Sequence, residues 1–278
     1  MRTISGEIIT EKIAKLVIEA NLYLPDDVKQ ALANALTQET NQCGREILRQ
    51  LIQNYKLAEQ TGLPLCQDTG LAIFFVELGT EIKINGNLIE AINLGVRQGY
   101  EQGFLRKSVC DPFTRKNTGD NTPALIHVDL VPGDQLKIKF MAKGGGSENM
   151  SRVTMLAPAQ GFAGIKEFVI QRVAEAGPNP CPPIIVGVGI GGSFDYAPIL
   201  AKKALFRRLD RPHPNPSIAE KEQELLQAIN ELGIGPMGLG GKTTCLGVKI
   251  ETHPCHIASL PLAVNIQCHS SRHKEVII

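Results

Sequence analysis

Apolar residues recur at helical spacing in the opening stretch of the chain, which predicts an amphipathic helix. The residues that carry this spacing are Ile8, Ile9, Ile13, Leu16 and Val17. A second helix is predicted from Pro25, because proline followed by Asp26 and Asp27 favours a first helical turn. A third helix is predicted over residues 41–59, ending at Gly62. The pattern therefore predicts a helical lead-in over about residues 1–60.

Beyond that point the pattern changes to short apolar runs separated by helical stretches and Gly- and Pro-rich turns. Strands are predicted at 71–78, 184–190 and in the segments TTCLGVKIE and LPLAVNIQC, and helices at 87–104, 161–176, 195–209 and 217–232. Residues 124–143 contain two strand-like runs joined by Pro132, Gly133 and Asp134, which predicts a hairpin. We expect an α/β fold: a helical N-terminal region, then a mixed β-sheet with flanking helices and Gly-rich loops at the site. Residues 61–278 would be the mixed α/β part of a single catalytic domain, 1–278.

Composition and charge narrow the class of protein. The chain has 278 residues, 43% of them hydrophobic and 21% charged, and its net charge is +1. These values are typical of a globular protein, and they give no basic face for nucleic acid. No apolar run is long enough to span a membrane, and the N-terminus lacks the features of a signal peptide. We therefore expect a cytoplasmic protein.

Three glycine-rich segments are candidates for ligand binding. KGGGSEN (143–149) exposes backbone N–H groups beside Lys143 and could bind an anion; we favour this over a flexible turn, because three glycines are costly in a mere turn. GVGIGG (187–192) satisfies the dinucleotide-binding pattern and keeps a nucleotide-binding module open as an alternative, but the next strand-like run lies far beyond it. GLGGKTT (238–244) resembles the end of a P-loop, but Pro236 stands where that motif needs glycine.

Seven cysteines are present, an odd number that argues against a disulfide framework. Cys66 lies in a polar loop before a strand, Cys181 lies among prolines before another strand, and Cys268 ends a third. Cys245 and Cys255 are rivals, because spacing alone does not select metal ligands and no close zinc-type pair is present. Buried inert thiols are the common alternative for any single cysteine.

Six segments in order carry a resemblance to a known family. They are LPLCQDTG, NTGDNTPA, KGGGSEN, PCPPIIVGVGIGG, GLGGKTT and HPCHIASLPLAVNIQCHSSR. Together they resemble class I fumarate hydratases, in the form that has a separate α subunit. The resemblance runs from about residue 5 to the C-terminus.

The resemblance implies a [4Fe–4S] cluster held by three cysteines. Cys66 and Cys181 match the first two ligands. Cys268, rather than Cys255, matches the third, and this match is less direct than the other two. It also implies roles around the substrate. Gln67 and Asp68 follow the first ligand, and Asp68 matches a proposed acid for proton transfer. Further contacts to substrate match Arg106, Lys143, the backbone of Gly146, and Lys242. His256 matches a catalytic histidine that enters the active site from a neighbouring subunit.

The activity implied is reversible hydration of fumarate to (S)-malate, a citric acid cycle reaction. The α subunit of L-tartrate dehydratase is a sister family with the same cluster. Lys143, Ser147 and Lys242 favour fumarate, because that sister family has a different residue pattern at these positions. Longer members of the fumarase family continue into a C-terminal domain that this chain lacks. We therefore expect a β subunit, a dimer of αβ units, and little activity from this chain alone.

Overall fold

The computed structural model describes residues 2–278 and has the mixed α/β architecture that the sequence predicts. The chain divides into two compact units. The first unit is formed by residues up to Pro25, by Tyr55–Gly145 and by Arg272–Ile278, and the second by Asp26–Asn54 and Gly146–Ser271. Each unit is therefore built from separate stretches of the chain. That the whole chain acts as one catalytic domain stays a prediction.

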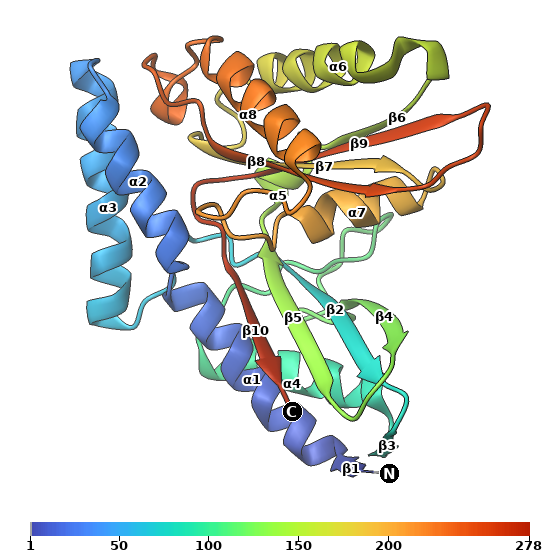
Figure 1. Cartoon of the computed structure of the whole chain (residues 1–278). Coiled ribbons are helices and arrows are strands. Elements are labelled where there is room, and N and C mark those ends of the chain that lie inside the picture. Colours follow the sequence, from blue (N-terminus) through green and yellow to red (C-terminus); the bar gives the residue numbers. More distant parts are fainter. Residues whose placement is uncertain (1) are drawn as a thin grey trace. The chain divides into compact units, whose positions relative to one another are not determined.

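The first unit is a four-stranded sheet packed against two helices (Figure 1). The strand order is β10 (His273–Ile277), β5 (Leu136–Lys143), β2 (Leu71–Gly79) and β4 (Leu125–Val131). The helices are α1 (Gly6–Leu22) and α4 (Leu88–Gln102), and two short strands, β1 (Arg2–Ser5) and β3 (Ile82–Asn85), pair in parallel.

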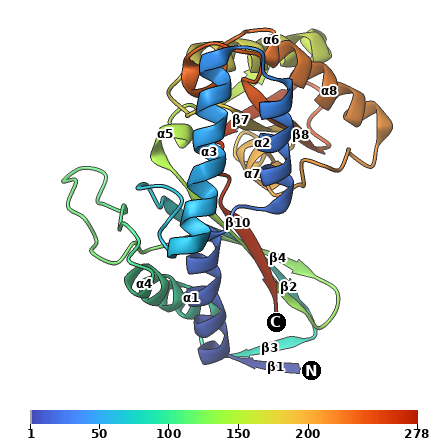
Figure 2. The ribbon, with the colours of Figure 1, turned by 90° about the vertical axis from the view of Figure 1, so that its left-hand side faces the viewer.

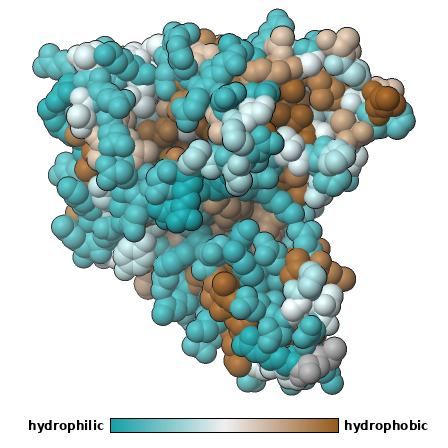
Figure 3. Space-filling model, viewed as in Figure 1, coloured by the Kyte–Doolittle hydropathy of each residue, from teal (hydrophilic) through white to brown (hydrophobic). Residues whose placement is uncertain are grey.

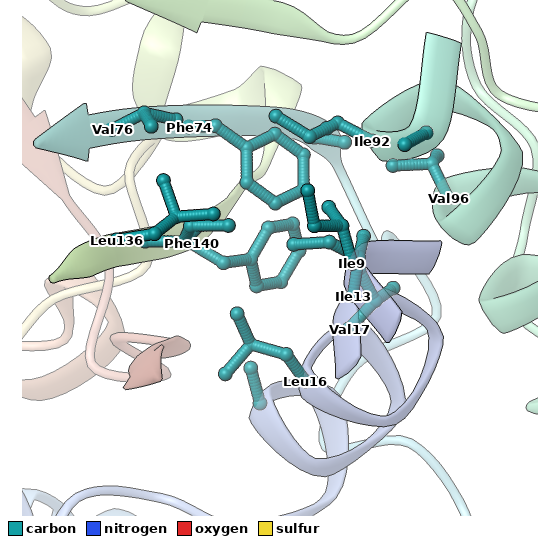
Figure 4. Packing of buried hydrophobic residues seen from close by; sticks show 14 of the residues in the cluster. Ile9, Ile13, Leu16, Val17, Phe74, Val76, Ile92, Val96, Leu136 and Phe140 are labelled. Atoms are coloured by element: carbon teal, nitrogen blue, oxygen red, sulfur yellow. The ribbon is translucent and has the colours of Figure 1, made fainter. Parts of the chain in front are cut away.

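The core of the first unit lies between the sheet and these helices. Phe74 of β2 and Phe140 of β5 are opposite each other in register, with ring centroids 5.1 Å apart. Both rings belong to one core cluster with Ile9 and Ile13 of α1 and Ile92 of α4 (Figure 4). Alternate residues of the two strands point to one face of the sheet, so the apolar runs of the sequence become one continuous core.

The sequence predicted that β4 and β5 pair as a hairpin, and this prediction is wrong. Both strands exist, but they do not pair with each other. β2 lies between them, paired in parallel with β4 and antiparallel with β5. The β2 strand is almost wholly buried, whereas β4 is largely exposed. Burial of β2 therefore favours the centre of the sheet, and the turn at Pro132 spans two strand spacings of about 4.8 Å each.

The second unit has a four-stranded sheet with helices on both faces (Figure 1). Its order is β6 (Arg152–Leu156), β9 (Leu260–Gln267), β7 (Ile184–Gly191) and β8 (Cys245–His253). α6 (Gly161–Ala176) and α8 (Pro216–Asn230) share an apolar core with one face. α7 (Tyr196–Ala204) covers the other face, where Ala197 and Ala201 meet Ala263 of β9. The short elements are α5 (Gly145–Glu148), η1 (Pro158–Gln160) and η2 (Pro236–Gly238).

The predicted helices of the lead-in are confirmed. Ser5 caps α1 by accepting a hydrogen bond from the Ile8 N–H. α2 (Asp26–Gln38) begins at the predicted acidic residues, and α3 (Gln42–Thr61) ends just before Gly62. α2 and residues 42–54 of α3 run antiparallel beside each other (Figures 1 and 2).

The surface in Figure 3 is mainly hydrophilic, with apolar residues in small groups. Such scattered apolar exposure is ordinary for a folded chain. Within residues 2–278, no helix is both long and apolar enough to cross a membrane.

Candidate active site

In the first unit, the predicted site residues gather around the loop that joins α3 to β2. This loop carries Cys66, Gln67 and Asp68. Its entry is fixed by α1, because the Leu65 N–H donates to the backbone oxygen of Asn21. The loop is therefore held by α1 on one side and leads directly into the central strand β2.

Asp68 is the best-oriented side chain of the loop. One carboxylate oxygen accepts the Gly70 N–H at 3.0 Å and the other accepts the Gly145 N–H at 2.8 Å. A Cβ on Gly144 would lie 3.1 Å from the same carboxylate, which is tight. The glycine run of KGGGSEN thus lets the Asp68 carboxylate approach the backbone closely, and Gly145 supplies one of its donors.

Three buried polar side chains hold the backbone behind Asp68. The Tyr100 hydroxyl donates to the Thr69 and Gly70 carbonyl oxygens at 2.8 and 3.1 Å, and the Asn121 amide donates to Gly70 O at 3.2 Å. Burial raises the pKa of Tyr100, so the phenol keeps its proton and remains a donor. The third is Thr69, whose hydroxyl donates to the Arg106 backbone oxygen at 2.9 Å.

The other predicted residues of the first unit lie beside this loop. Cys66 is half-buried, and its thiol donates to the Gln67 side-chain oxygen at 3.3 Å. Arg106 is exposed, and its backbone is tied to the loop through Thr69. Lys143 is fully buried at the end of β5, opposite Leu71 in register. The first unit therefore brings one predicted cluster ligand together with a carboxylate, an amide and two cations.

In the second unit, Cys181 and Cys268 lie at the same end of the sheet. Cys181 precedes β7 and Cys268 follows β9, and these antiparallel strands pair Ile185 with Gln267. The ring of His269 is 2.9 Å from the Cys181 carbonyl oxygen. Cys181 has a positive φ of 55°, a strained conformation that non-glycine residues keep mainly at functional sites.

Cys255 and His256 lie at the opposite end of β9, in the exposed loop that joins it to β8. β9 has eight residues, so Cys255 is roughly 25 Å from Cys268 along the strand. The arrangement separates Cys255 from Cys181 and Cys268. In the same loop, the Ala258 N–H donates to His256 Nδ1 at 3.1 Å, so a neutral His256 carries its proton on Nε2.

Two further predicted residues lie in loops of the second unit. Gly146 is exposed, and a Cβ there would lie 3.5 Å from the Asn179 carbonyl oxygen, in the loop before Cys181. Lys242 is exposed, and its loop is fixed by Glu39, which is 1% exposed. One Glu39 oxygen accepts the Lys242 and Thr243 N–H groups at 2.8 and 3.3 Å.

The thiols can be compared with what an iron–sulfur cluster needs. Within residues 2–278, no three His, Cys, Asp or Glu side chains form a ready group for a metal ion. Cys66 belongs to the first unit, and Cys181 and Cys268 belong to the second. All three are half-buried, whereas Cys245 is buried in the apolar core of the second unit, which is typical of an inert structural thiol.

The buried amide of Gln267, next to Cys268 in the sequence, supports a binding site for a further group at this end of the sheet. Gln267 is fully buried, and neither polar atom of its side chain has a hydrogen-bond partner among residues 2–278. A buried unpaired amide is costly and is a common sign of an absent group. The donor chemistry of the half-buried thiol in the first unit, and of the two half-buried thiols and the orphaned amide in the second, fits a cluster.

The glycines of GVGIGG serve to pack a helix. A Cβ on Gly187 would lie 2.1 Å from the Ala201 carbonyl oxygen, and one on Gly189 would lie 2.0 Å from that of Ala197. Both atoms belong to α7, which lies directly on β7. The glycine spacing of the dinucleotide-binding pattern is present, and the next strand of the chain, β8, pairs in parallel with β7. However, close helix packing accounts for these two glycines without a nucleotide.

Sequence reasoning missed several residues that build this site. Arg272, Tyr100 and Asn121 support the Asp68 loop, and Glu39 supports the Lys242 loop. Arg272 ends the last segment of the family resemblance and Asn121 lies within NTGDNTPA, whereas Tyr100 and Glu39 have no local signal in the sequence. Their roles depend on contacts between distant segments.

The first unit holds a half-buried thiol, a carboxylate fixed by backbone N–H groups and an exposed guanidinium, and the second unit holds two further half-buried thiols and an exposed lysine. Groups of these kinds occur in enzymes that add or remove water on acidic substrates. Comparison with known proteins makes the class specific. Residues 10–277 match the family model "Fumarate hydratase (Fumerase)". The chain belongs to this family of hydro-lyases.

Two similar relatives carry names that refer to tartrate. A protein of Methanocaldococcus jannaschii, provisionally named L(+)-tartrate dehydratase subunit alpha, is 46% identical over 95% of both chains. The L(+)-tartrate dehydratase subunit alpha of Escherichia coli O157:H7 is 34% identical over 97% of this chain and 90% of its own length. These names support the sister family better than the fumarate activity that the sequence analysis favoured.

Proposed function

We propose that this chain is the α subunit of an iron–sulfur hydro-lyase that removes water from L-tartrate. The observation that carries the proposal is the Asp68 carboxylate, held by two backbone N–H groups two residues after Cys66. The names of the curated relatives support the choice of substrate. Fumarate hydration is the second candidate.

Cys66, Cys181 and Cys268 would hold the cluster, as the family resemblance implies. When bound, a cluster of this type supplies an iron with an open coordination site, which acts as a Lewis acid. Cys268 is preferred to Cys255, because Cys268 and Cys181 lie at one end of the second-unit sheet and Cys255 lies at the other.

The remaining residues would hold the dicarboxylate and move protons. The exposed Arg106 guanidinium suits a carboxylate, since it can donate two parallel hydrogen bonds. Gln67, Lys143, Lys242 and the backbone of Gly146 would make the other contacts. In dehydration of L-tartrate, a C–H proton leaves to a base, and the hydroxyl on the neighbouring carbon takes a proton from an acid and leaves as water. The resulting enol rearranges to oxaloacetate.

Asp68 and His256 are the proposed proton-transfer groups. Asp68 is already fixed in orientation, which is what proton transfer requires. His256 presents Nε2 away from its own loop when neutral, because Nδ1 is occupied by the Ala258 N–H. The family resemblance supports a role for His256 in the site of a neighbouring copy.

Fumarate stays a candidate because of particular residues. Lys143 and Ser147 are buried at the glycine run, and Lys242 is exposed in its fixed loop. The resemblance associates these residue types with fumarate rather than tartrate. Both substrates are four-carbon dicarboxylates, so the same anion-binding groups would serve either.

The relatives are named alpha subunits, which supports a β-subunit partner for this chain. We propose an assembly of αβ units in the cytoplasm, with the β subunit completing the active site. The isolated chain should then turn over neither dicarboxylate at an appreciable rate.

The test is a comparison of kcat/KM for L-tartrate and for fumarate, using the anaerobically prepared αβ complex. We expect turnover of L-tartrate to exceed that of fumarate. A preference for fumarate would select the second candidate, and turnover of neither would contradict the hydro-lyase proposal.

The substitution Asp68→Asn tests the proposed role of Asp68 in the same assay. It should lower kcat/KM about 10²–10⁴-fold, as expected for loss of a proton-transfer group. The control is Asp134→Asn, in the exposed turn between β4 and β5, which should leave kcat/KM unchanged.

A further inference from the structure

Arg272 is a buried cation without a carboxylate partner. It precedes β10 and is 1% exposed. No ion pair joins it to an Asp or Glu anywhere in residues 2–278, and its Nε has no hydrogen-bond acceptor there. A guanidinium taken out of water without a counter-charge is costly. Its place in the fold therefore needs an explanation beyond packing.

The contacts that Arg272 does make lead to the Asp68 loop. One terminal nitrogen, Nη1, donates to the Asp68 carbonyl oxygen at 2.5 Å and to the Asn21 side-chain oxygen at 3.3 Å. Asn21 also accepts the Leu65 N–H through its backbone oxygen. Arg272 thus joins both ends of the loop that contains Cys66 and Gln67.

The other side of the guanidinium lies near the Asp68 carboxylate. A Cβ added to Gly144 would lie 3.1 Å from the carboxylate oxygen Oδ2 and 3.5 Å from Arg272 Nη2. Both charged groups thus border the same side of Gly144. Tyr100 and Asn121 already hold the neighbouring carbonyl groups with neutral donors, so the loop does not need a charge merely to stay folded.

We propose that Arg272 is a positioning residue that fixes the Asp68 carboxylate for proton transfer and places a permanent positive charge beside it. The inference rests on the proposed hydro-lyase function. Arg272 acts through Asp68 and not by direct contact with the reacting atoms. Its removal should therefore affect the rate of turnover more than the affinity for the substrate.

The experiment uses the anaerobic αβ complex with Arg272→Met and Arg272→Lys. The kcat value, normalised to bound iron, should fall about 10–100-fold in Arg272→Met, as expected when a catalytic group is misplaced. KM should change less than threefold, and a threefold change corresponds to a free-energy difference of about 0.65 kcal/mol. Arg272→Lys should recover part of the loss, because it keeps the charge and one donor.

Arg172→Met is the matched control, because Arg172 is also buried but pairs with Glu175 on α6. It should lower the melting temperature without changing kcat per bound iron. If Arg272→Met does not fold, the test is the kcat of Arg272→Lys compared with that of the wild type. An unchanged kcat per iron in a folded Arg272 variant would overturn the positioning role. Absence of turnover in the wild-type complex would instead overturn the proposed function.

Discussion

The seven thiols of this chain have very different surroundings, and those surroundings decide their chemistry. Cys245 is buried in β8, donates to the Gly247 carbonyl oxygen at 3.3 Å, and has a pKa raised by burial to about 12. Cys43 and Cys255 are exposed. Because the thiolate is the reactive form, exposure and pKa together predict an order of reactivity.

Iodoacetamide at pH 8, followed by mass spectrometry of the cluster-free chain, checks this order. Cys43 and Cys255 should be alkylated first, and Cys245 should stay unmodified while the chain is folded. In urea all seven should react, which is the control for access. Modification of Cys245 in the folded chain at the rate of Cys255 would contradict the assigned burial.

At this scale the sequence indicated the residues that carry chemistry better than those that support them. The resemblance indicated Cys66, Asp68 and Arg106, and the fold places them on or beside one loop. Arg272 and Tyr100 act on that loop from segments far away in the chain. No local pattern marks a buried arginine or tyrosine as a support, because its role exists only after the chain has folded.

Among the elements, β7 and α7 show how a sequence motif can serve packing. Gly187 and Gly189 let the α7 backbone lie directly on β7. A methyl group at either position would overlap a helix carbonyl oxygen, and a packed interior has no room to absorb it. The dinucleotide-type spacing therefore follows from close approach of a helix to a strand.

Gly187→Ala should lower the free energy of unfolding by about 1–3 kcal/mol through this overlap. Urea unfolding followed by circular dichroism measures the change. Gly6→Ala is the control, because its nearest neighbour would lie at an ordinary 3.6 Å. Equal stability of the two variants would refute the packing explanation.

The α2–α3 connection and the Lys242 loop are joined by one carboxylate. Glu39 accepts the Thr40 and Asn41 N–H groups with one oxygen and the Lys242 and Thr243 N–H groups with the other. Since such backbone donors are costly to leave unpaired in a buried site, Glu39 determines the conformation of the loop.

Glu39→Gln replaces one acceptor oxygen by a donor and should cost about 1–3 kcal/mol of unfolding free energy. Glu46→Gln is the control, because Glu46 is exposed and pairs with Arg49 on the surface; such pairs contribute about 0–1 kcal/mol. Both values come from urea titrations. If Glu39→Gln lowers the unfolding free energy no more than Glu46→Gln does, the hydrogen bonds of Glu39 contribute nothing to stability.

Prediction of elements from sequence succeeded where periodicity was strong and failed where pairing decided the outcome. The helices α1, α2, α3 and α6 and the strands β2 and β7 follow from their apolar spacing. The hairpin between β4 and β5 failed because β2 takes the central place, a tertiary effect that turn residues do not encode. The short strands β1, β3, β6 and β10 were missed because each has only four or five residues, too few to show a period.

On the scale of the whole molecule, the chain is built from two compact units, each assembled from discontinuous segments. The resemblance takes one cysteine, Cys66, from the first unit and two, Cys181 and Cys268, from the second. Sequence order alone did not reveal this division. Cluster binding by this ligand set would require both units to be folded.

The most direct measurement is the iron and acid-labile sulfide content of the anaerobically reconstituted chain, compared between wild type, Cys181→Ser and Cys255→Ser. We predict about four iron and about four sulfide per wild-type chain, a similar content in Cys255→Ser, and loss of the cluster in Cys181→Ser. A full complement in Cys181→Ser, or no iron and sulfide in the wild type, would contradict the ligand set and with it the iron–sulfur hydro-lyase.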